Sequence, residues 1–199
     1  MSKMSVRVLG SGHHVHLNRE ALDILFGKGF ELEVKRYLEE GSTELYVSKQ
    51  QVTVVGPKGE LRCSILGALR PYNQVEVSYT DAQLLGVNPK LTNSGQLEGT
   101  APCKLIGPAG ELELKEGMMV ARRHIHLNAE EMAELGCKVG DMVRVRIPGP
   151  RALTFEQVAV CKGMRAVVHV DYDEMNAAGF KNSDNLMAEV ELCGDARAD

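Results

Sequence analysis

The 199-residue sequence contains no tryptophan, few other aromatic residues and no long apolar run. No segment approaches the roughly 20 consecutive apolar residues that a membrane-spanning helix needs, so no membrane is expected as a partner. Acidic residues outnumber basic ones by 27 to 23, and this balance argues against a general nucleic-acid-binding protein. A hydrophobic fraction of 44% is typical of a folded globular chain.

Disulfide and cofactor-loop motifs are also lacking. The five cysteines are scattered, odd in number and without a C-x-x-C pair, which favours a reducing cytoplasm over an oxidising compartment. There is no nucleophile elbow, no Walker loop and no dinucleotide-binding glycine pattern after a strand. The chemistry is therefore expected to use a metal and a bound anion, without a covalent enzyme intermediate.

An internal repeat dominates what is present. The segment H-V-H-L-N-R-E at residues 14–20 recurs as H-I-H-L-N-A-E at residues 124–130, and each copy leads into a helical pattern that ends at a glycine. Residues 75–81 and 168–174 match the same pattern without H-x-H. Each copy has a helix N-cap residue two positions after its ligand-type residue: Asn18, Ser78, Asn128 and Asp171. The sequence thus predicts four strand-to-helix units, with chance recurrence as the alternative.

Short strands and turns fill the space between these units. G-P-K-G at residues 56–59 and G-P-A-G at residues 107–110 predict two hairpins, and residues 141–147 are expected to pair with 153–160. The predicted fold is mainly β with short α-helices, as two pseudo-symmetric β-barrel domains capped by helices. We expect the halves to be residues 1–92 and 93–199, joined through residues 88–101, with elements that can be exchanged between them.

The two H-x-H motifs predict metal sites. Residues two apart on a strand face the same side, so His14 with His16, and His124 with His126, can each converge on one ion. Two imidazoles and one further ligand leave room for substrate, as in catalytic zinc sites. The repeat supplies Glu76 and His169 as third ligands. The alternatives are a surface carboxylate for Glu76 and a hydrogen-bonded core histidine for His169.

Other polar residues near the motifs suit an anion. Arg70 lies six residues before Glu76, and Arg122 and Arg123 directly precede the second H-x-H. A guanidinium group matches phosphate or carboxylate oxygens, and Ser11, between two glycines, could donate to an anion. Exposed loop arginines and a plain turn serine are the alternatives. Strand alternation directs His13 away from His14, so His13 is left out of the metal set.

The ordered motifs resemble those of one family. They are H-V-H-L, L-G-x-x-R leading to V-E-V-S, the paired G-P-x-G turns, A-x-R-H-I-H-L, and H-V-D-x-D-E-x-N-A-A-G. Over residues 11–188 the chain resembles the phosphate propanoyltransferases, zinc-dependent phosphotransacylases associated with bacterial microcompartments. The resemblance implies two β-barrels with a two-zinc site between them. It assigns His14, His16 and Glu76 to one zinc, and His124, His126 and His169 to the other, with Arg70 and Ser11 on phosphate. Arg123, which directly precedes His124, is a further candidate for substrate binding.

The implied reaction converts propanoyl-CoA or acetyl-CoA plus orthophosphate into acyl phosphate plus coenzyme A, and the reverse. Two departures from the family pattern are visible. His13 stands where the family usually has an arginine, and no N-terminal encapsulation extension precedes the first motif. We therefore expect a bacterial cytoplasmic enzyme, with a microcompartment and a homo-oligomer as further candidates. The alternatives are a metal-dependent acyl-CoA thioester hydrolase, and a catalytically weakened CoA- or metal-binding microcompartment component.

Overall fold

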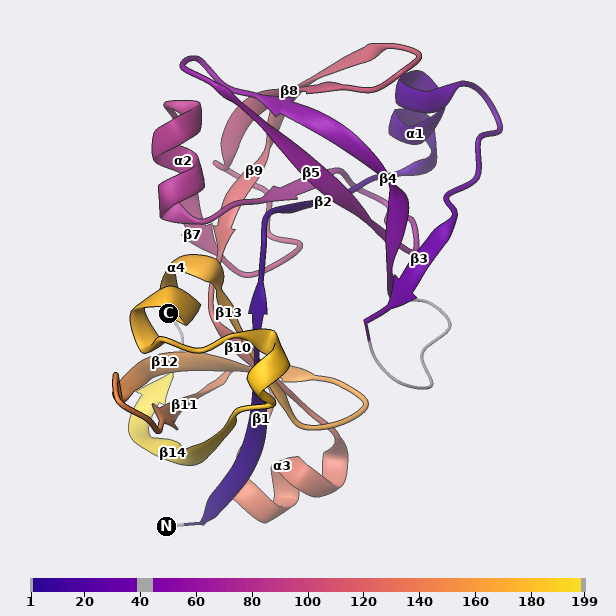
Figure 1. Ribbon diagram of the computed structural model, residues 1–199. Coiled ribbons are helices and arrows are strands. Elements are labelled where there is room, and N and C mark those ends of the chain that lie inside the picture. Colours follow the sequence, from indigo (N-terminus) through magenta and orange to yellow (C-terminus); the bar gives the residue numbers. More distant parts are fainter. Residues whose placement is uncertain (1, 39–44, 198–199) are drawn as a thin grey trace. The chain divides into compact units, whose positions relative to one another are not determined.

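A computed structural model describes residues 2–38 and 45–197. The chain forms two compact units (Figure 1). Unit 1 comprises residues 1–11 and 122–199, and unit 2 comprises residues 12–121. The sequence division at residues 92 and 93 falls inside unit 2, and residues 88–101 lie within that unit as well. The difference has two parts: β1 (Lys3–Ser11) pairs with strands of unit 1, and residues 101–121 pair with strands of unit 2.

Unit 2 contains a closed barrel of six strands. The strand order is β4-β5-β2-β6-β9-β8, and pairing of β8 with β4 completes the ring. The additional strands β3 and β7 pair with β4 and β9 on the outside of this ring. The elements are β2 (His14–His16), α1 (Arg19–Phe26), β3 (Val34–Tyr37), β4 (Tyr46–Val55), β5 (Glu60–Gly67), β6 (Gln74–Glu76), α2 (Tyr79–Leu85), β7 (Lys90–Thr92), β8 (Ala101–Ile106) and β9 (Glu111–Ala121).

Unit 1 contains a second closed barrel, with the order β1-β13-β10-β12-β11-β14. Each H-x-H strand pairs in its ring with a strand from the next strand-to-helix unit of the same barrel, as β2 with β6 and β10 with β13. The predicted fold of two helix-capped β-barrels is confirmed. Besides β1, the elements are β10 (His124–Leu127), α3 (Ala129–Leu135), β11 (Asp141–Ile147), β12 (Leu153–Lys162), β13 (Val167–Asp171), α4 (Tyr172–Ala178), the 3-10 turn η1 (Asn182–Asp184) and β14 (Met187–Arg197).

The four helices begin where the repeat predicts. Asn18, Ser78, Asn128 and Asp171 each accept a hydrogen bond from a backbone N–H of the first helical turn. The last three also form reciprocal capping boxes with the acid three residues on. Three helices end in a glycine with left-handed backbone, a conformation that glycine adopts without steric cost. These caps fix the direction in which the chain leaves each ligand-bearing strand.

The two G-P-x-G hairpin turns cap the far ends of the helices in unit 2. The Lys58 N–H donates to the Leu85 carbonyl at the end of α2 (3.0 Å), and the Ala109 N–H donates to the Leu25 carbonyl of α1 (2.9 Å). In Figure 1 the β4–β5 turn reaches α2 and the β8–β9 turn reaches α1. The pairing is crossed, because the turn that follows the first strand-to-helix unit caps the helix of the second unit, and the turn that follows the second caps the helix of the first. Helix and barrel are thereby held together at both ends.

Each barrel encloses its own apolar core. Unit 2 buries a cluster around Val15, Leu22 and Ile65, and unit 1 buries one around Ile125, Val143 and Val168. In both units the central residue of H-x-H points into the core, which directs the two histidines to the opposite face of the strand. Among the described residues, no helix combines the length and the apolar character required to cross a bilayer.

Candidate functional site

Strand pairing brings each predicted third ligand to its H-x-H motif. His14 lies directly opposite Glu76 on β2 and β6, and His124 lies directly opposite His169 on β10 and β13. In each unit, one side-chain donor atom from each of the three residues lies within 4.8 Å of the other two. The structure therefore assembles both triads that the repeat predicts. Metal binding itself stays a prediction.

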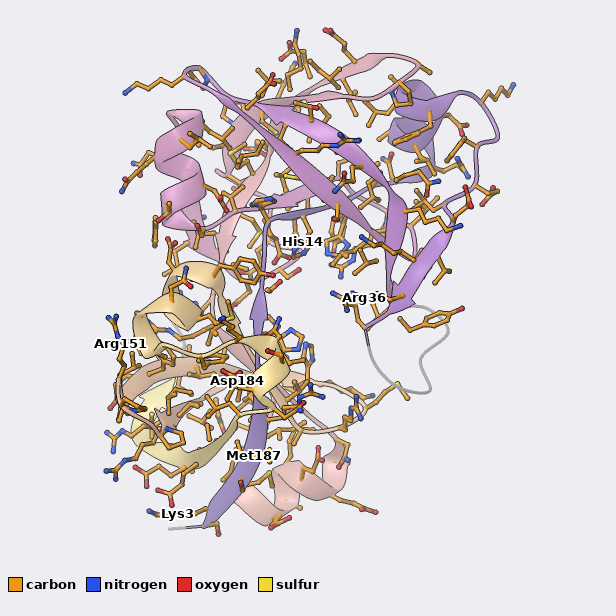
Figure 2. All side chains as sticks on the ribbon, in the orientation of Figure 1. Lys3, His14, Arg36, Arg151, Asp184 and Met187 are labelled. Atoms are coloured by element: carbon orange, nitrogen blue, oxygen red, sulfur yellow. The ribbon has the colours of Figure 1, made fainter. Side chains whose placement is uncertain are left out.

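The two H-x-H pairs have nearly the same geometry. The rings of His14 and His16 have centroids 5.0 Å apart at 89°, and those of His124 and His126 are 4.9 Å apart at 90°. The triads differ in exposure. His14 and His16 are only 6% and 3% exposed, whereas the three histidines of unit 1 are half-buried. Figure 2 shows His14 among the side chains of unit 2.

Backbone carbonyls set the tautomers of the leading histidines. Nδ1 of His14 lies 2.8 Å from the Gly12 carbonyl, and Nδ1 of His124 lies 3.0 Å from the Arg122 carbonyl. A carbonyl oxygen only accepts, so Nδ1 carries the proton and the neutral ring offers the lone pair of Nε2. In unit 1 the Lys162 carbonyl, 3.2 Å away, holds His126 in the same way. His14, His124 and His126 thus present Nε2 as the metal-binding atom.

The unit 2 triad has a spacing that suits a small metal ion. Nε2 of His14 lies 3.5 Å from Oε2 of Glu76, and Nε2 of His16 lies 4.0 Å from Oε1. A zinc tetrahedron with bonds of 2.0–2.1 Å has ligand–ligand edges of about 3.3 Å. The apposed imidazole and carboxylate donors therefore fit zinc after small side-chain adjustments.

Charge is distributed unevenly within this buried triad. Burial lowers the pKa of His16 to about 3, and the positive charges of His14 and Arg70 act in the same direction. Burial also opposes the charged form of His14, but Glu76 and the Gly12 carbonyl outweigh it, so the pKa of His14 is raised. Glu76 therefore favours the charged form of His14 in the metal-free chain.

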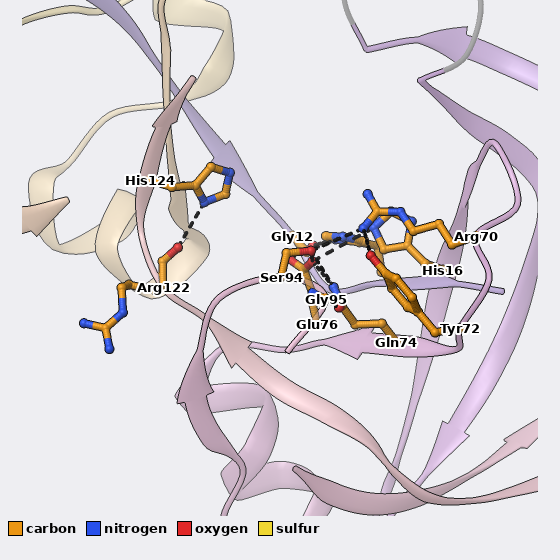
Figure 3. A network of polar contacts seen from close by, with 11 residues as sticks. Gly12, His16, Arg70, Tyr72, Gln74, Glu76, Ser94, Gly95, Arg122 and His124 are labelled. Atoms are coloured by element: carbon orange, nitrogen blue, oxygen red, sulfur yellow. Dashed lines mark hydrogen bonds and ion pairs between the residues drawn. The ribbon is translucent and has the colours of Figure 1, made fainter. Parts of the chain in front are cut away.

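A polar network links Arg70 to the triad (Figure 3). Nη1 of Arg70 donates to the Tyr72 hydroxyl (3.0 Å) and to Oγ of Ser94 (3.3 Å), and Ser94 in turn donates to Oε1 of Glu76 (3.3 Å). Gln74 donates from Nε2 to Oε1 of Glu76 (2.6 Å) and to Ser94 (2.8 Å). The predicted phosphate-binding arginine is thus held one side chain away from a predicted metal ligand.

Sequence reasoning missed Ser94 and Gln74. Ser94 belongs to residues 88–101, which were expected to connect the halves, but it lies over the unit 2 triad through its bond to Glu76. Gln74 is fully buried and sits opposite His16 in the strand register. The only sequence signal for Gln74 was its place in the repeat, four residues before the N-cap Ser78, where His14 precedes Asn18 and His124 precedes Asn128.

Two other candidates belong to unit 1, Ser11 and Arg123. Ser11 ends β1 in unit 1 opposite Asp171, whereas Arg70 belongs to unit 2. Arg123 pairs with Glu174 (Nε to Oε1, 3.2 Å) and stacks over Phe155 (5.1 Å to the ring centroid).

His13 lies outside both triads and pairs with Asp81, 3.2 Å away. This hydrogen bond raises the pKa of His13. The roles of Ser11 and Arg123 in substrate binding stay predictions.

Comparison with known proteins agrees with the architecture and the motifs. The family model described as phosphate propanoyltransferase matches residues 7–181. The chain is 43% identical over 188 residues to the phosphate propanoyltransferase of Salmonella typhimurium, covering 92% of this chain and 87% of the relative. It is 39% identical over 178 residues to that of Clostridioides difficile, covering 88% and 84%. The relative from Thermotoga maritima is 43% identical over 187 residues, covering 92% and 87%.

These matches place the chain among the phosphate acyltransferases. It belongs to the phosphate propanoyltransferase family.

Proposed function

We propose that the protein transfers a short acyl group between coenzyme A and orthophosphate, with propanoyl-CoA or acetyl-CoA as the thioester. The observation that carries this proposal is the joining of Arg70 to the His14, His16 and Glu76 triad through Ser94. An anion-binding guanidinium and a set of metal ligands then face one reaction centre. Family membership supports the phosphate and acyl parts of the assignment.

Two zinc ions are the proposed cofactors, one in each triad. Imidazole nitrogen and carboxylate oxygen are zinc ligands, and three protein ligands leave a position for substrate. A zinc ion bound there would polarise the thioester and stabilise the thiolate of the departing coenzyme A. His16 is neutral because burial lowers its pKa to about 3, so one of its ring nitrogens has a lone pair available without loss of a proton.

The chain's own residues bind and orient the reactants. Arg70 presents two guanidinium nitrogens to phosphate oxygens, while its bonds to Tyr72 and Ser94 fix the plane of the group. A phosphate oxygen forms the new bond to the acyl carbon, and the C–S bond breaks with its electron pair passing to sulfur. The proton of hydrogen phosphate ends on the thiol or in solvent. Acyl phosphate and coenzyme A are the products.

A covalent enzyme intermediate has no support from the cysteines. Burial raises the pKa of Cys63 and of Cys103 to about 12, so both thiols are protonated at neutral pH. Burial also raises the pKa of Cys161, the cysteine that precedes Lys162. We therefore propose direct attack of phosphate on the thioester.

The decisive experiment incubates the purified chain and zinc with propanoyl-CoA or acetyl-CoA, with and without phosphate. Hydroxylamine traps acyl phosphate as a hydroxamate, and free thiol is measured in parallel. The proposal requires phosphate-dependent hydroxamate equal to the thiol released. Thiol release without hydroxamate would identify a thioester hydrolase instead. Substoichiometric zinc, together with a weak turnover that Arg70→Ala does not change, would identify a catalytically weakened binding component.

A further inference from the structure

We infer that Gln74 is a positioning residue, one that holds Glu76 as a one-oxygen ligand and makes the mixed imidazole–carboxylate site of unit 2 possible. The inference rests on the proposed metal site. It starts from the strand registers of the two units. His16 lies opposite Gln74 where His126 lies opposite Val167, and His14 lies opposite Glu76 where His124 lies opposite His169. The two triads therefore differ at two neighbouring positions. Unit 2 has Glu76 and Gln74 where unit 1 has His169 and Val167.

The orientation of the Gln74 amide follows from its neighbours. The Gly95 backbone N–H donates to Oε1 of Gln74 at 2.7 Å. A backbone N–H only donates, so the oxygen of the amide must face Gly95 and the nitrogen must face Glu76. The nitrogen then donates to Oε1 of Glu76 (2.6 Å) and to Ser94 (2.8 Å). Because Gln74 is fully buried, these bonds have no competition from bulk water.

The carboxylate of Glu76 is consequently divided between two tasks. Its Oε1 accepts from Gln74 and Ser94, while its Oε2 faces Nε2 of His14 at 3.5 Å. A carboxylate has lone pairs on both oxygens, so it can accept these bonds and still offer one oxygen to a metal. Holding Oε1 also removes the rotational freedom that a flexible glutamate would lose on binding the ion.

An imidazole in the place of Glu76 would need a neighbour that has no N–H donor. Its metal-binding nitrogen has a single lone pair, and an amide N–H aimed at that lone pair would compete with the metal. Unit 1 meets this need, since the residue beside His169 in the register is the apolar, buried Val167. Glutamate is therefore matched to a neighbouring glutamine, and histidine to a neighbouring valine. A histidine ligand is unsuited to a glutamine neighbour, and a glutamate ligand is unsuited to a valine neighbour.

The test uses the full chain with the unit 1 triad disabled by His124→Ala and His169→Ala, so that unit 2 alone is observed. Zinc affinity is measured by competition with a chromophoric chelator, and cobalt(II) absorption reports the ligand geometry. Gln74→Val should weaken zinc binding by about 10- to 100-fold, as is typical when a residue that orients a ligand is lost. Gln96→Val is the matched control, because Gln96 is an exposed glutamine in the loop that carries Ser94, where it accepts a hydrogen bond from Thr92.

A second pair of variants separates positioning from mere destabilisation. Glu76→His with Gln74 retained should bind zinc weakly, and adding Gln74→Val should restore affinity at least tenfold, with a cobalt spectrum of the three-histidine type. Should Gln74→Val alone fail to fold, this comparison decides the matter.

Two results would overturn the inference alone: a folded Gln74→Val chain that binds zinc as tightly as its parent, or no gain from adding Gln74→Val to Glu76→His. If the parent with Gln74 intact binds no zinc, the metal site of the proposed function fails and the inference fails with it.

Discussion

Glu76 and His169 occupy the same position in two copies of one strand-to-helix pattern, yet they create different sites. The unit 1 triad consists of three imidazoles with ring centroids 4.9–5.4 Å apart, whereas the unit 2 triad contains a carboxylate. A carboxylate adds negative charge and lowers the Lewis acidity of a bound metal compared with a third imidazole. At the residue scale, the two sites are therefore suited to different parts of one reaction.

Arg70 is the residue whose loss should affect the reaction most directly. Arg70→Ala should reduce kcat/KM for phosphate by about 10²- to 10³-fold, since it removes a fixed donor to a developing charge. Arg70→Lys should recover only part of this loss, because an ammonium group lacks the planar fork. Initial rates at varied phosphate concentration measure the effect.

The control for Arg70 is Arg144→Ala. Arg144 forms exposed ion pairs with Glu156 and Glu191, and such pairs contribute little to the stability of a fold. Its kcat/KM should stay within about twofold of the parent's. Equal losses in the two variants would contradict the role of Arg70.

The cysteines allow a separate test at this scale. With pKa values raised by burial to about 12, Cys63 and Cys103 have about one thiolate in ten thousand at pH 8. Both should remain unreacted with Ellman's reagent in the folded chain and react fully in urea. Peptide mapping by mass spectrometry identifies the protected positions. Fast labelling of either residue in the folded chain would contradict the buried environment.

The sequence predicted residues that share a short pattern and missed those that meet through tertiary contacts. His14, His16 and Glu76 were found because the repeat aligns them, and the strand register then joins them. Ser94 reaches Glu76 from 18 residues further along the chain, in a loop whose composition indicated only a connection. No periodicity encodes such a contact, because the fold of the loop determines it.

At the scale of elements, local capping signals carried most of the predictive information. The structure confirms the helix starts and ends, both G-P-x-G hairpins and the pairing of residues 141–147 with β12. Each of these features depends on residues that are close in the sequence. The placement of β1 was not predicted. Its pairing with β13 and β14 joins residues more than 150 positions apart, and an alternating apolar strand fits either barrel equally well.

The crossed hairpin caps lead to a prediction about stability. A Cβ atom added at Gly107 would collide with the Leu25 carbonyl at the end of α1, which is backbone and cannot move freely. Gly107→Ala should therefore lower the free energy of unfolding by about 1–3 kcal/mol. Urea unfolding of the metal-free chain, followed by circular dichroism, measures the change.

Pro108→Ala alters the same turn without that collision and should cost about 1 kcal/mol or less. Equal losses in both variants would show that the turn, and not its contact with α1, determines stability.

At the scale of the whole molecule, the duplication gives two barrels with separate cores and separate triads. Each triad lies within a single unit, so neither needs a ligand from the other. Microcompartment association follows from the family resemblance alone, and a homo-oligomer is a further candidate. The independence of the triads, in contrast, follows from the placement of their ligands and can be measured directly.

His169→Ala should empty the unit 1 site and leave the unit 2 site filled, lowering zinc from two ions per chain to one. Removing one of three ligands leaves two imidazoles, which bind zinc too weakly to survive dialysis against a mild chelator. Glu76→Ala should give the reciprocal result. Inductively coupled plasma mass spectrometry gives the zinc content, and thermal unfolding with and without zinc shows whether the remaining ion stabilises the fold. Loss of both ions from either variant would mean that the two sites depend on each other, contrary to their placement in separate barrels.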